Sequence, residues 1–343
     1  MPQPPLEPRS VLLAGDIGGT KALLALSGPH DAGFERHYPC DAFGSFDSLL
    51  RRFLDDARAN LDGPPVISRA CLGVAGPVDG ERARMTNRNW DIDSAALGLE
   101  FEIPEFCLVN DFAAAAHGLD ALGAGDRVTL QPGAPIESAP RLLLGAGTGL
   151  GVTVLLSRGE NLRVIAGVGG HAGFAPADEL QDALCRHLRH SFGRVELEHV
   201  VSGAGLERIY AFLRDTGRRT GQALARQAPA GSASAAAITR AALDQGESLA
   251  IAALDLFISC YGAAAGDYAL AVLARGGVYI AGGIAPKILP RLRGGGFVAA
   301  FNAKGNFSAA ARSFPVHVVT NERVVLLGAQ ALALAGATRQ AGL

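Results

Sequence analysis

One aspartate stands alone where an apolar run gives way to an alanine-rich segment. In the stretch CLVNDFAAAAHGL, residues 107–119, Asp111 is the only carboxylate between Glu105 and Asp120, and Asn110 precedes it. A carboxylate in such a place can accept a proton during a reaction. It can also cap the alanine-rich helix, because aspartate is a preferred N-cap residue. Its position at the end of a predicted strand, taken by itself, favours the cap.

Glycine-rich turns form a second group of residues with possible chemistry. The stretches SVLLAGDIGGTKALLALSG (10–28) and RLLLGAGTGLGVTVLLSRG (141–159) each predict strand, turn and strand, and AGGI (281–284) follows a later strand. Hairpin turns need glycine for backbone reasons, which explains any single turn without a function. Several such turns favour phosphate binding, because unhindered N–H groups can point at phosphate oxygens.

Neither hairpin carries a familiar nucleotide motif. DIGGTK has P-loop residues in another order and precedes a strand, not a helix. GAGTGLG lacks the sixth-position glycine of the dinucleotide fingerprint. The remaining interpretation is that the two hairpins, one in each domain, together bind a nucleotide. Asp16 at the first turn would repel phosphate unless a hydrated Mg²⁺ lay between them, so the pattern indicates Mg²⁺ there. The alternative for Asp16 is a turn residue that caps its own backbone.

The elements around these residues predict two α/β domains. The two hairpins begin about 130 residues apart, and we expect each to open its own domain. EFCLVND (105–111) predicts a strand with Asn110 and Asp111 at its carboxyl end. Residues 190–270 predict mostly helix, and ERVVLLGAQALALAGATRQ predicts a final helix.

Composition limits the function classes. The chain has 343 residues, of which 49% are hydrophobic and 19% charged, so it is globular. Its net charge of -2 does not predict a nucleic-acid partner. The start MPQPPLEPRS lacks the pattern of a signal peptide, and the apolar region 249–284 is interrupted by Asp255, Asp267 and Arg275. We therefore expect no membrane helix and a cytoplasmic location.

A series of segments, in a fixed order, resembles the bacterial glucokinases of the hexokinase and actin-like ATPase superfamily. They are AGDIGGTKALLAL, VAGPVDG, MTNRNW, VNDFAAAAHGL, GAGTGLGV, GGHAGFAP, EHVVSGAGLERIY, YIAGGIAPKIL and AFNAKGNF. The resemblance runs from about Leu12 to Leu334 and depends on this ordered combination. It implies ATP-dependent phosphorylation of glucose to glucose 6-phosphate, with ATP and Mg²⁺ as cofactors.

The resemblance also implies a fold. It is an α/β fold of two ribonuclease-H-like domains, of the actin and hexokinase type, with an interdomain cleft that takes ATP and, deeper, the sugar. The smaller domain would comprise residues 1–121, completed by a C-terminal helix over 323–343, and the larger domain residues 122–322. A homodimer is implied as well.

Particular residues receive roles from the family's motifs. Asp111 matches the catalytic base, and Asn110 matches the partner that holds ring hydroxyls of the sugar. His171, Glu198 and Asn87 match further sugar contacts. The nucleotide would contact Asp16, Gly18, Gly19, Thr20, Gly147, Thr148, Gly149, Gly282 and Gly283, with Asp16 also on the metal. Without the resemblance, His171 would be a structural histidine, Glu198 a helix-surface acid and Asn87 a turn residue.

The chain departs from the family at one position. Where the family usually has glutamate before the glycine pair, as in E-G-G-H, this chain has Val168, which accepts no hydrogen bond from its side chain. We therefore expect weakened affinity for the sugar. A kinase for another hexose or amino sugar, and a non-catalytic sugar- or nucleotide-binding regulator, remain alternatives. The retained Asp111 and the glycine turns favour an enzyme.

Overall fold

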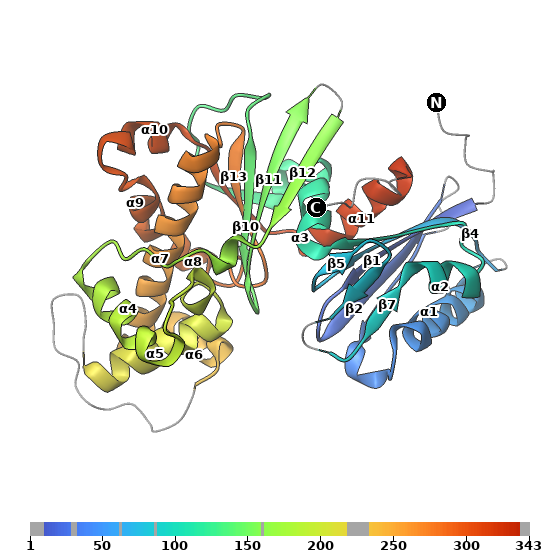
Figure 1. Cartoon of the computed structure of the whole chain (residues 1–343), viewed down its shortest axis with the longest axis horizontal. Helices are drawn as coiled ribbons and strands as arrows, with labels where there is room; N and C mark the ends of the chain where they lie inside the picture. The colour runs from blue at the N-terminus through green and yellow to red at the C-terminus, as the bar shows by residue number, and fades with distance from the viewer. Residues whose placement is uncertain are drawn as a thin grey trace. The chain divides into compact units, whose positions relative to one another are not determined.

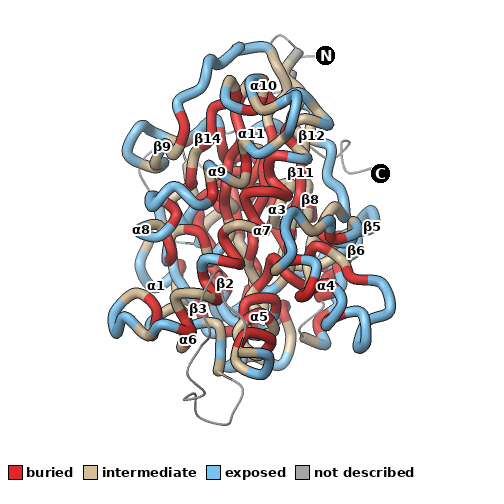
Figure 2. Tube along the Cα trace, turned by 90° about the vertical axis from the view of Figure 1, so that its left-hand side faces the viewer, coloured by how far each residue is buried: buried red, intermediate tan, exposed pale blue. Residues whose placement is uncertain are grey.

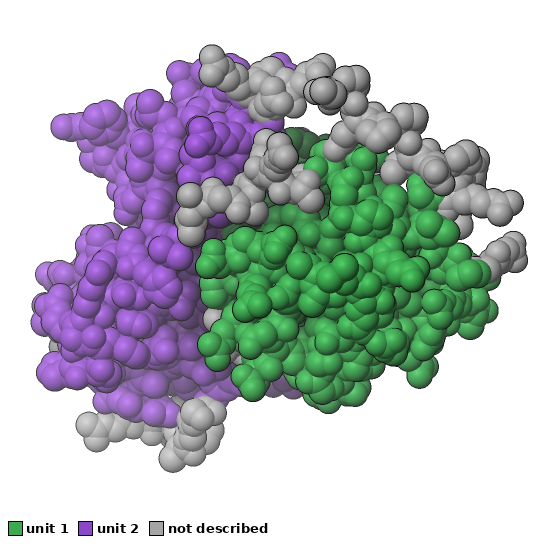
Figure 3. Space-filling model, turned by 45° about the vertical axis from the view of Figure 1, so that its right-hand side comes forward, with its two compact units in different colours: residues 1–123, 321–343 green, residues 124–320 purple. Residues whose placement is uncertain are grey.

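The computed structural model describes residues 10–28, 33–61, 64–85, 88–158, 161–217 and 233–336. The chain divides into two units (Figure 3). Unit 1 comprises Met1–Gly123 and Asn321–Leu343, and unit 2 comprises Ala124–Thr320. Each unit has its own sheet and its own hydrophobic core, so each is described by itself.

The main sheet of unit 1 has five strands in the order β3-β2-β1-β4-β8. They are β1 (Ser10–Ile17), β2 (Lys21–Ser27), β3 (Phe34–Pro39), β4 (Val66–Val74) and β8 (Glu105–Asn110). β1, β2 and β3 are antiparallel neighbours, whereas β1, β4 and β8 run parallel. A smaller sheet consists of β5 (Val78–Asp79), β6 (Arg82–Arg84) and β7 (Asp91–Asp93). The first predicted hairpin is thus confirmed as β1 and β2.

Helices cover both faces of this sheet (Figure 1). They are η1 (Cys40–Ala42), α1 (Phe46–Asn60), α2 (Ser94–Glu100), α3 (Asp111–Gly118), η2 (Leu119–Ala121) and α11 (Val324–Ala335). Because strand side chains alternate, Leu13 packs in the cluster that contains Phe53 of α1. Its neighbours Leu12 and Ala14 pack in the cluster that contains Leu326 of α11.

Helices α3 and α11 approach each other closely at two glycines. A Cβ atom on Gly328 would lie 1.7 Å from the carbonyl oxygen of Ala114, and one on Gly118 would lie 2.0 Å from that of Val324. Real Cβ atoms do not come so near to backbone atoms. The contact therefore requires glycine, and it sets the position of α3, whose first residue is Asp111.

We expect Gly328→Ala to destabilise the protein by about 1–3 kcal/mol, the usual effect of overpacking. The clash must outweigh the better helix propensity of alanine, which is about 1 kcal/mol. Urea denaturation measures the change. Gly44→Ala is the matched control, because a Cβ on Gly44 meets nothing within 4 Å. Equal stability of the two variants would contradict the close packing of α3 and α11.

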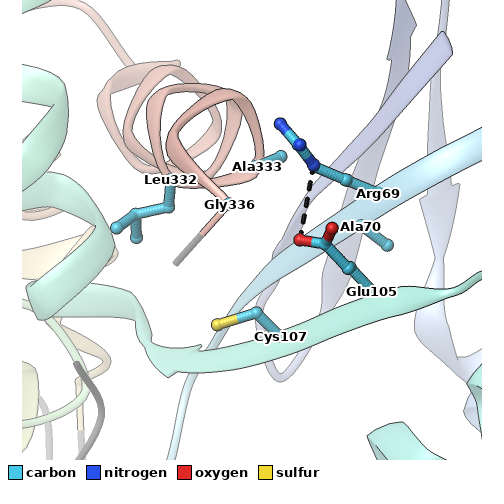
Figure 4. A pocket seen from close by; sticks show the side chains of 7 residues that line it. All are labelled: Arg69, Ala70, Glu105, Cys107, Leu332, Ala333 and Gly336. Carbon is cyan, nitrogen blue, oxygen red and sulfur yellow. Dashed lines mark ion pairs between the residues drawn. The ribbon is translucent and has the colours of Figure 1, made fainter. Parts of the chain in front are cut away.

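The end of α11 is anchored on strand β4 of the main sheet (Figure 4). Arg69 of β4 donates from Nη1 to the carbonyl oxygen of Leu334 at 3.1 Å, and its Nε lies 3.3 Å from Oε2 of Glu105. The Arg69 side chain is largely buried. A cation near the last carbonyls of a helix also complements the helix dipole. The C-terminal segment thereby becomes part of unit 1.

Unit 2 repeats the strand arrangement of unit 1. Its sheet has the order β12-β11-β10-β13-β14-β9, with antiparallel pairs along β10, β11 and β12 and parallel pairs along β10, β13 and β14. The strands are β9 (Arg127–Gln131), β10 (Arg141–Ala146), β11 (Leu150–Arg158), β12 (Asn161–Gly167), β13 (Gly277–Ala281) and β14 (Val316–Val319). β9 adds an antiparallel edge strand. The second predicted hairpin is thus confirmed as β10 and β11.

One long helix, α7 (Ser248–Val272), lies among the shorter helices of unit 2. The others are η3 (Ala124–Asp126), η4 (Gly169–His171), α4 (Glu179–Phe192), η5 (Leu197–His199), α5 (Gly203–Thr216), α6 (Ala235–Leu243), α8 (Leu289–Leu292), α9 (Gly296–Asn302), η6 (Gly305–Phe307) and α10 (Ser308–Ser313). By length and composition α7 would suffice to cross a membrane, but 78% of its apolar window is buried inside the protein. Figure 2 shows α7 among the buried part of the trace. It is the core helix of unit 2.

Candidate active site

Two carboxylates of unit 1 meet at one edge of the main sheet. Asp16 pairs with Gly73 near the end of β1, and Asn110 pairs with Val74 where β8 ends. The carboxyl ends of parallel strands lie at the same edge, so Asp111 follows directly at that edge. Burial, and after it the charge of Asp111, raise the pKa of Asp16. The structure therefore brings together two of the predicted site residues.

The first glycine turn lies beside these carboxylates, between β1 and β2. The N–H of Gly18 donates to the carbonyl oxygen of Lys21 at 3.0 Å and closes the hairpin. Among the described residues, nothing accepts from the N–H groups of Gly19 and Thr20. Two adjacent backbone donors without a protein acceptor suit an anionic ligand such as phosphate.

Asn110, not Asp111, caps helix α3. Its Oδ1 accepts from the N–H of Phe112 at 2.9 Å and from the N–H of Ala113 at 3.4 Å, while Nδ2 donates to the carbonyl oxygen of Gly76 at 3.1 Å. Asp111 is the first helical residue, and its Oδ1 accepts from Phe112 at 2.9 Å. The alternative role of Asp111 as the N-cap is therefore wrong. The Asn110 side chain also hydrogen-bonds to the Asp111 carboxylate, so it holds both the start of α3 and the neighbouring acid.

Burial raises the pKa of both carboxylates. It raises the pKa of Asp111 to about 6, although hydrogen bonds from Phe112, from the Asp111 backbone and from Asn110 oppose the change. Burial and the charge of Asp111 raise the pKa of Asp16 to about 7. A base whose pKa lies near neutrality is well matched to proton transfer. A hard divalent cation at Asp16 would offset the repulsion, and a single carboxylate is a common protein ligand of Mg²⁺ when phosphates supply others.

The second and third glycine turns lie side by side in unit 2. The turn of Gly147–Gly149 joins β10 to β11, and Gly147 N–H donates to the Gly149 carbonyl oxygen at 2.8 Å. Gly282 and Gly283 follow β13, whose Ala281 pairs with Gly145 of β10. Gly282 has φ +82°, and a Cβ there would lie 2.6 Å from the Ala146 carbonyl oxygen. Thr148 is exposed at the tip of its turn.

Glu198 supports the second glycine turn. Its Oε2 accepts from the N–H of Leu150 at 2.9 Å, and the same atom would be 2.5 Å from a Cβ on Gly149. Ser202 holds the backbone of Glu198 by donating from Oγ to its carbonyl oxygen at 2.7 Å. Glu198 lies in the 3₁₀ turn η5 and bonds to another element, so its interpretation as a helix-surface acid is wrong.

His171 has a carboxylate partner that sequence reasoning missed. Its Nδ1 lies 2.8 Å from Oε2 of Glu196, which raises the pKa of His171 and lowers that of Glu196. The charge of Glu198 also raises the pKa of His171. The only signal in the sequence is the spacing of two acids in RVELEH, which does not identify their partners.

The turn that carries His171 is held by backbone and tyrosine contacts. Tyr268 donates from its hydroxyl to the carbonyl oxygen of Gly169 at 2.6 Å, and His171 N–H donates to that of Val168 at 3.0 Å. Val168 itself is 79% exposed. An apolar side chain with this exposure contributes little to the core, so the position is free to change. Asn87, the remaining predicted sugar contact, lies outside the residues that the structure describes.

Comparisons with known proteins agree on one family. The family model described as Glucokinase matches residues 13–336. A glucokinase of Nostoc sp. is 41% identical over 339 residues, which cover 93% of this chain and 98% of that protein. The crystal structure of a glucokinase from an Antarctic psychrotroph is 31% identical, with a TM-score of 0.79 over 95% of this chain and 99% of that one.

A more distant structure shares the fold. A ROK family glucokinase from Streptomyces griseus, solved in complex with glucose and AMPPNP, is 20% identical with a TM-score of 0.60. The match covers 95% of this chain and 100% of the chain of that glucokinase. These matches confirm the predicted two-part α/β fold of the sugar kinases.

Proposed function

Because the chain belongs to the glucokinase family and is a sugar kinase, we propose that it transfers the γ-phosphate of ATP to glucose and forms glucose 6-phosphate. The observation that carries this proposal is the pair of half-buried carboxylates at one sheet edge, Asp16 beside the glycine turn and Asp111 at the start of α3. A kinase of this kind needs one carboxylate toward the metal-bound phosphates and one toward the hydroxyl.

Asp111 acts as the general base in this proposal. The glucose hydroxyl is a weak nucleophile, and Asp111 accepts its proton as the hydroxyl attacks the γ-phosphorus. The bond from Phe112 N–H to Oδ1 keeps the carboxylate in one orientation. Asn110 holds the start of α3 in place and exchanges one of its amide hydrogen bonds for a ring hydroxyl when the sugar binds. A pKa of about 6 keeps Asp111 mostly ionised at neutral pH.

The glycine turns bind the phosphates. The N–H groups of Gly19 and Thr20 donate to phosphate oxygens, and Asp16 holds the metal that travels with ATP. Gly147–Gly149 and Gly282–Gly283 let the nucleotide lie against the backbone of unit 2. Mg²⁺, when bound, neutralises charge that develops on the transferred phosphoryl group.

His171 and Glu198 bind the sugar. Glu196 orients the ring of His171 and leaves its Nε2 to contact a sugar hydroxyl. Leu150 N–H bonds one oxygen of Glu198, so the other oxygen can accept from a second hydroxyl. The same proposal includes a homodimer, which rests on the family resemblance, and the cytoplasmic location expected from the sequence.

Val168→Glu tests the sugar pocket. A hydrogen bond between a carboxylate and a sugar hydroxyl contributes roughly 1.5–3 kcal/mol. We therefore expect the variant to raise kcat/KM for glucose by about 10–150-fold, mainly through a lower KM. Steady-state kinetics on glucose and on sugars altered at single ring hydroxyls measure the effect. Val168→Gln, which keeps the size without the charge, is the control. Loss of activity in Val168→Glu, with a wild type that prefers another sugar, would contradict the glucose assignment.

A coupled assay of ADP release tests the whole proposal. Wild-type protein with ATP and Mg²⁺ is given glucose, other hexoses and amino sugars, and glucose should give the highest kcat/KM. A different preferred sugar would support the alternative hexose or amino-sugar kinase. ADP release with none of the sugars, together with calorimetric binding of glucose, would instead indicate a regulator.

A further inference from the structure

Each carbonyl oxygen of the Gly18–Thr20 turn accepts a hydrogen bond from outside the hairpin. The Gly19 oxygen accepts from Nε of Arg88 at 2.5 Å. The Gly18 oxygen accepts from Sγ of Cys40 at 3.4 Å, and the Thr20 oxygen accepts from the Cys40 N–H at 2.9 Å. The turn is therefore held by two residues, Arg88 and Cys40, that belong to neither of its strands.

These bonds determine where the free N–H groups of the turn point. In a trans peptide the C=O of one residue and the N–H of the next point in opposite directions. Holding the Gly18 oxygen on one side directs the N–H of Gly19 to the other side. Holding the Gly19 oxygen does the same for the N–H of Thr20. The Gly19 and Thr20 N–H groups, which have no acceptor among the described residues, are the donors whose orientation Arg88 and Cys40 set.

Arg88 is itself held in place. Its Nη1 donates to the carbonyl oxygen of Cys40 at 3.0 Å, and its guanidinium lies 5.4 Å from the centre of the Trp90 ring. Trp90 is buried, and its indole N–H donates to the carbonyl oxygen of Gly44 at 3.1 Å. The planar guanidinium therefore links two backbone segments through a fixed pair of donors, which a lysine ammonium cannot reproduce.

We propose that Arg88, together with Cys40, is a positioning residue for phosphate binding: it holds the Gly18–Thr20 turn so that the Gly19 and Thr20 N–H groups face a nucleotide phosphate. The inference rests on the proposed function, because it assumes that this turn binds ATP. It predicts a selective defect. Loss of Arg88 weakens the interaction with nucleotide, whereas sugar binding through His171 and Glu198 is unaffected.

The test compares Arg88→Ala and Arg88→Lys with wild type. A hydrogen bond involving a charged group corresponds to about 10–150-fold in affinity, so Arg88→Ala should raise the KM for ATP and the Kd for AMPPNP within that range. The KM for glucose should change by less than about twofold. Arg88→Lys should show an intermediate defect, since it keeps the charge but not the pair of donors. Arg84→Ala is the matched control, because Arg84 is exposed and lies 3.8 Å from Asp91 in the same region.

Several outcomes separate this proposal from a structural role. An unchanged Kd for AMPPNP in folded Arg88→Ala overturns it, and so does an equal rise in the KM values for ATP and glucose. If Arg88→Ala does not fold, Cys40→Ala decides, because it removes only the bond to the Gly18 oxygen and should raise the Kd for AMPPNP by a smaller factor. A wild type that binds AMPPNP but phosphorylates no sugar would refute the proposed function. The Kd for AMPPNP, measured by calorimetry, would still test the role of Arg88. A wild type that does not bind AMPPNP overturns the Arg88 proposal.

Discussion

Asp111→Asn should lower kcat for glucose phosphorylation by about 10²–10⁴-fold, the usual contribution of a general base. Asparagine has nearly the same shape, so it can still accept from the N–H of Phe112 and leave α3 in place. It cannot take up the proton of the sugar hydroxyl. The KM for glucose should therefore change little compared with kcat.

Steady-state kinetics and calorimetric glucose binding measure these two effects separately. Asp47→Asn is the control. It is the same substitution at an exposed position, in the first turn of α1. Near-wild-type turnover in Asp111→Asn would remove Asp111 from the role of base. A variant that loses glucose binding and turnover together would make Asp111 a binding residue only.

The pH dependence follows from the raised pKa of Asp111. With a pKa of about 6, the carboxylate is mostly protonated below that pH and cannot act as a base, so kcat/KM should fall as the pH drops below about 6. The residual activity of Asp111→Asn should lack this decrease. A pH profile of wild type that stays flat down to pH 5 would contradict the assignment.

The same shift makes a prediction about stability. The pKa of Asp111 in the folded state, about 6, lies above its ordinary value of 3.8. The fold therefore favours the protonated form, and stability is lost as the pH rises through this interval. Asp111→Asn has no charge to bury, so its Tm at pH 8 should equal or exceed that of wild type. This outcome would show that the carboxylate is kept at some cost in stability.

Asp16→Asn should reduce kcat/KM for ATP by about 10²–10³-fold, because metal-assisted stabilisation of phosphoryl transfer is worth several kcal/mol. The amide lacks the charge that attracts Mg²⁺ but has the size of the carboxylate. The requirement for Mg²⁺ should move to higher concentrations, and the KM for glucose should stay near that of wild type. Titration with Mg²⁺ at saturating glucose measures the shift.

Asp47→Asn again controls for loss of one negative charge in unit 1. A rise confined to the KM for glucose would show that Asp16 faces the sugar and not the phosphates. Removal of Mg²⁺ from wild type with EDTA should abolish turnover. Undiminished turnover in EDTA would contradict the proposal that Asp16 binds Mg²⁺.

Local pattern alone predicted much of the framework. Apolar alternation broken by glycine predicted the β1–β2 and β10–β11 hairpins, since strand residues alternate faces and glycine permits tight turns. The alanines after Asp111 predicted helix α3. The ordered motifs identified the family, which the comparisons confirm. Each of these signals lies in a few neighbouring residues or in the order of motifs along the chain.

The choice between Asn110 and Asp111 as the helix cap shows where such patterns fail. Both residue types are favoured N-caps, and they are adjacent in the chain. The structure selects Asn110 because its amide also reaches the carbonyl oxygen of Gly76, 34 residues earlier. Only the pairing of β4 with β8 brings these segments together.

What the sequence by itself determined is the family, the two repeated hairpins and the strand-end position of Asp111. Tertiary structure alone decided which groups surround these residues: Glu196 beside His171, Glu198 on Leu150 N–H, and Arg88 on the Gly19 carbonyl oxygen. Each of these contacts joins segments between 25 and 69 residues apart. Their existence depends on which distant segments pair and pack together, and local periodicity predicts single helices and strands only.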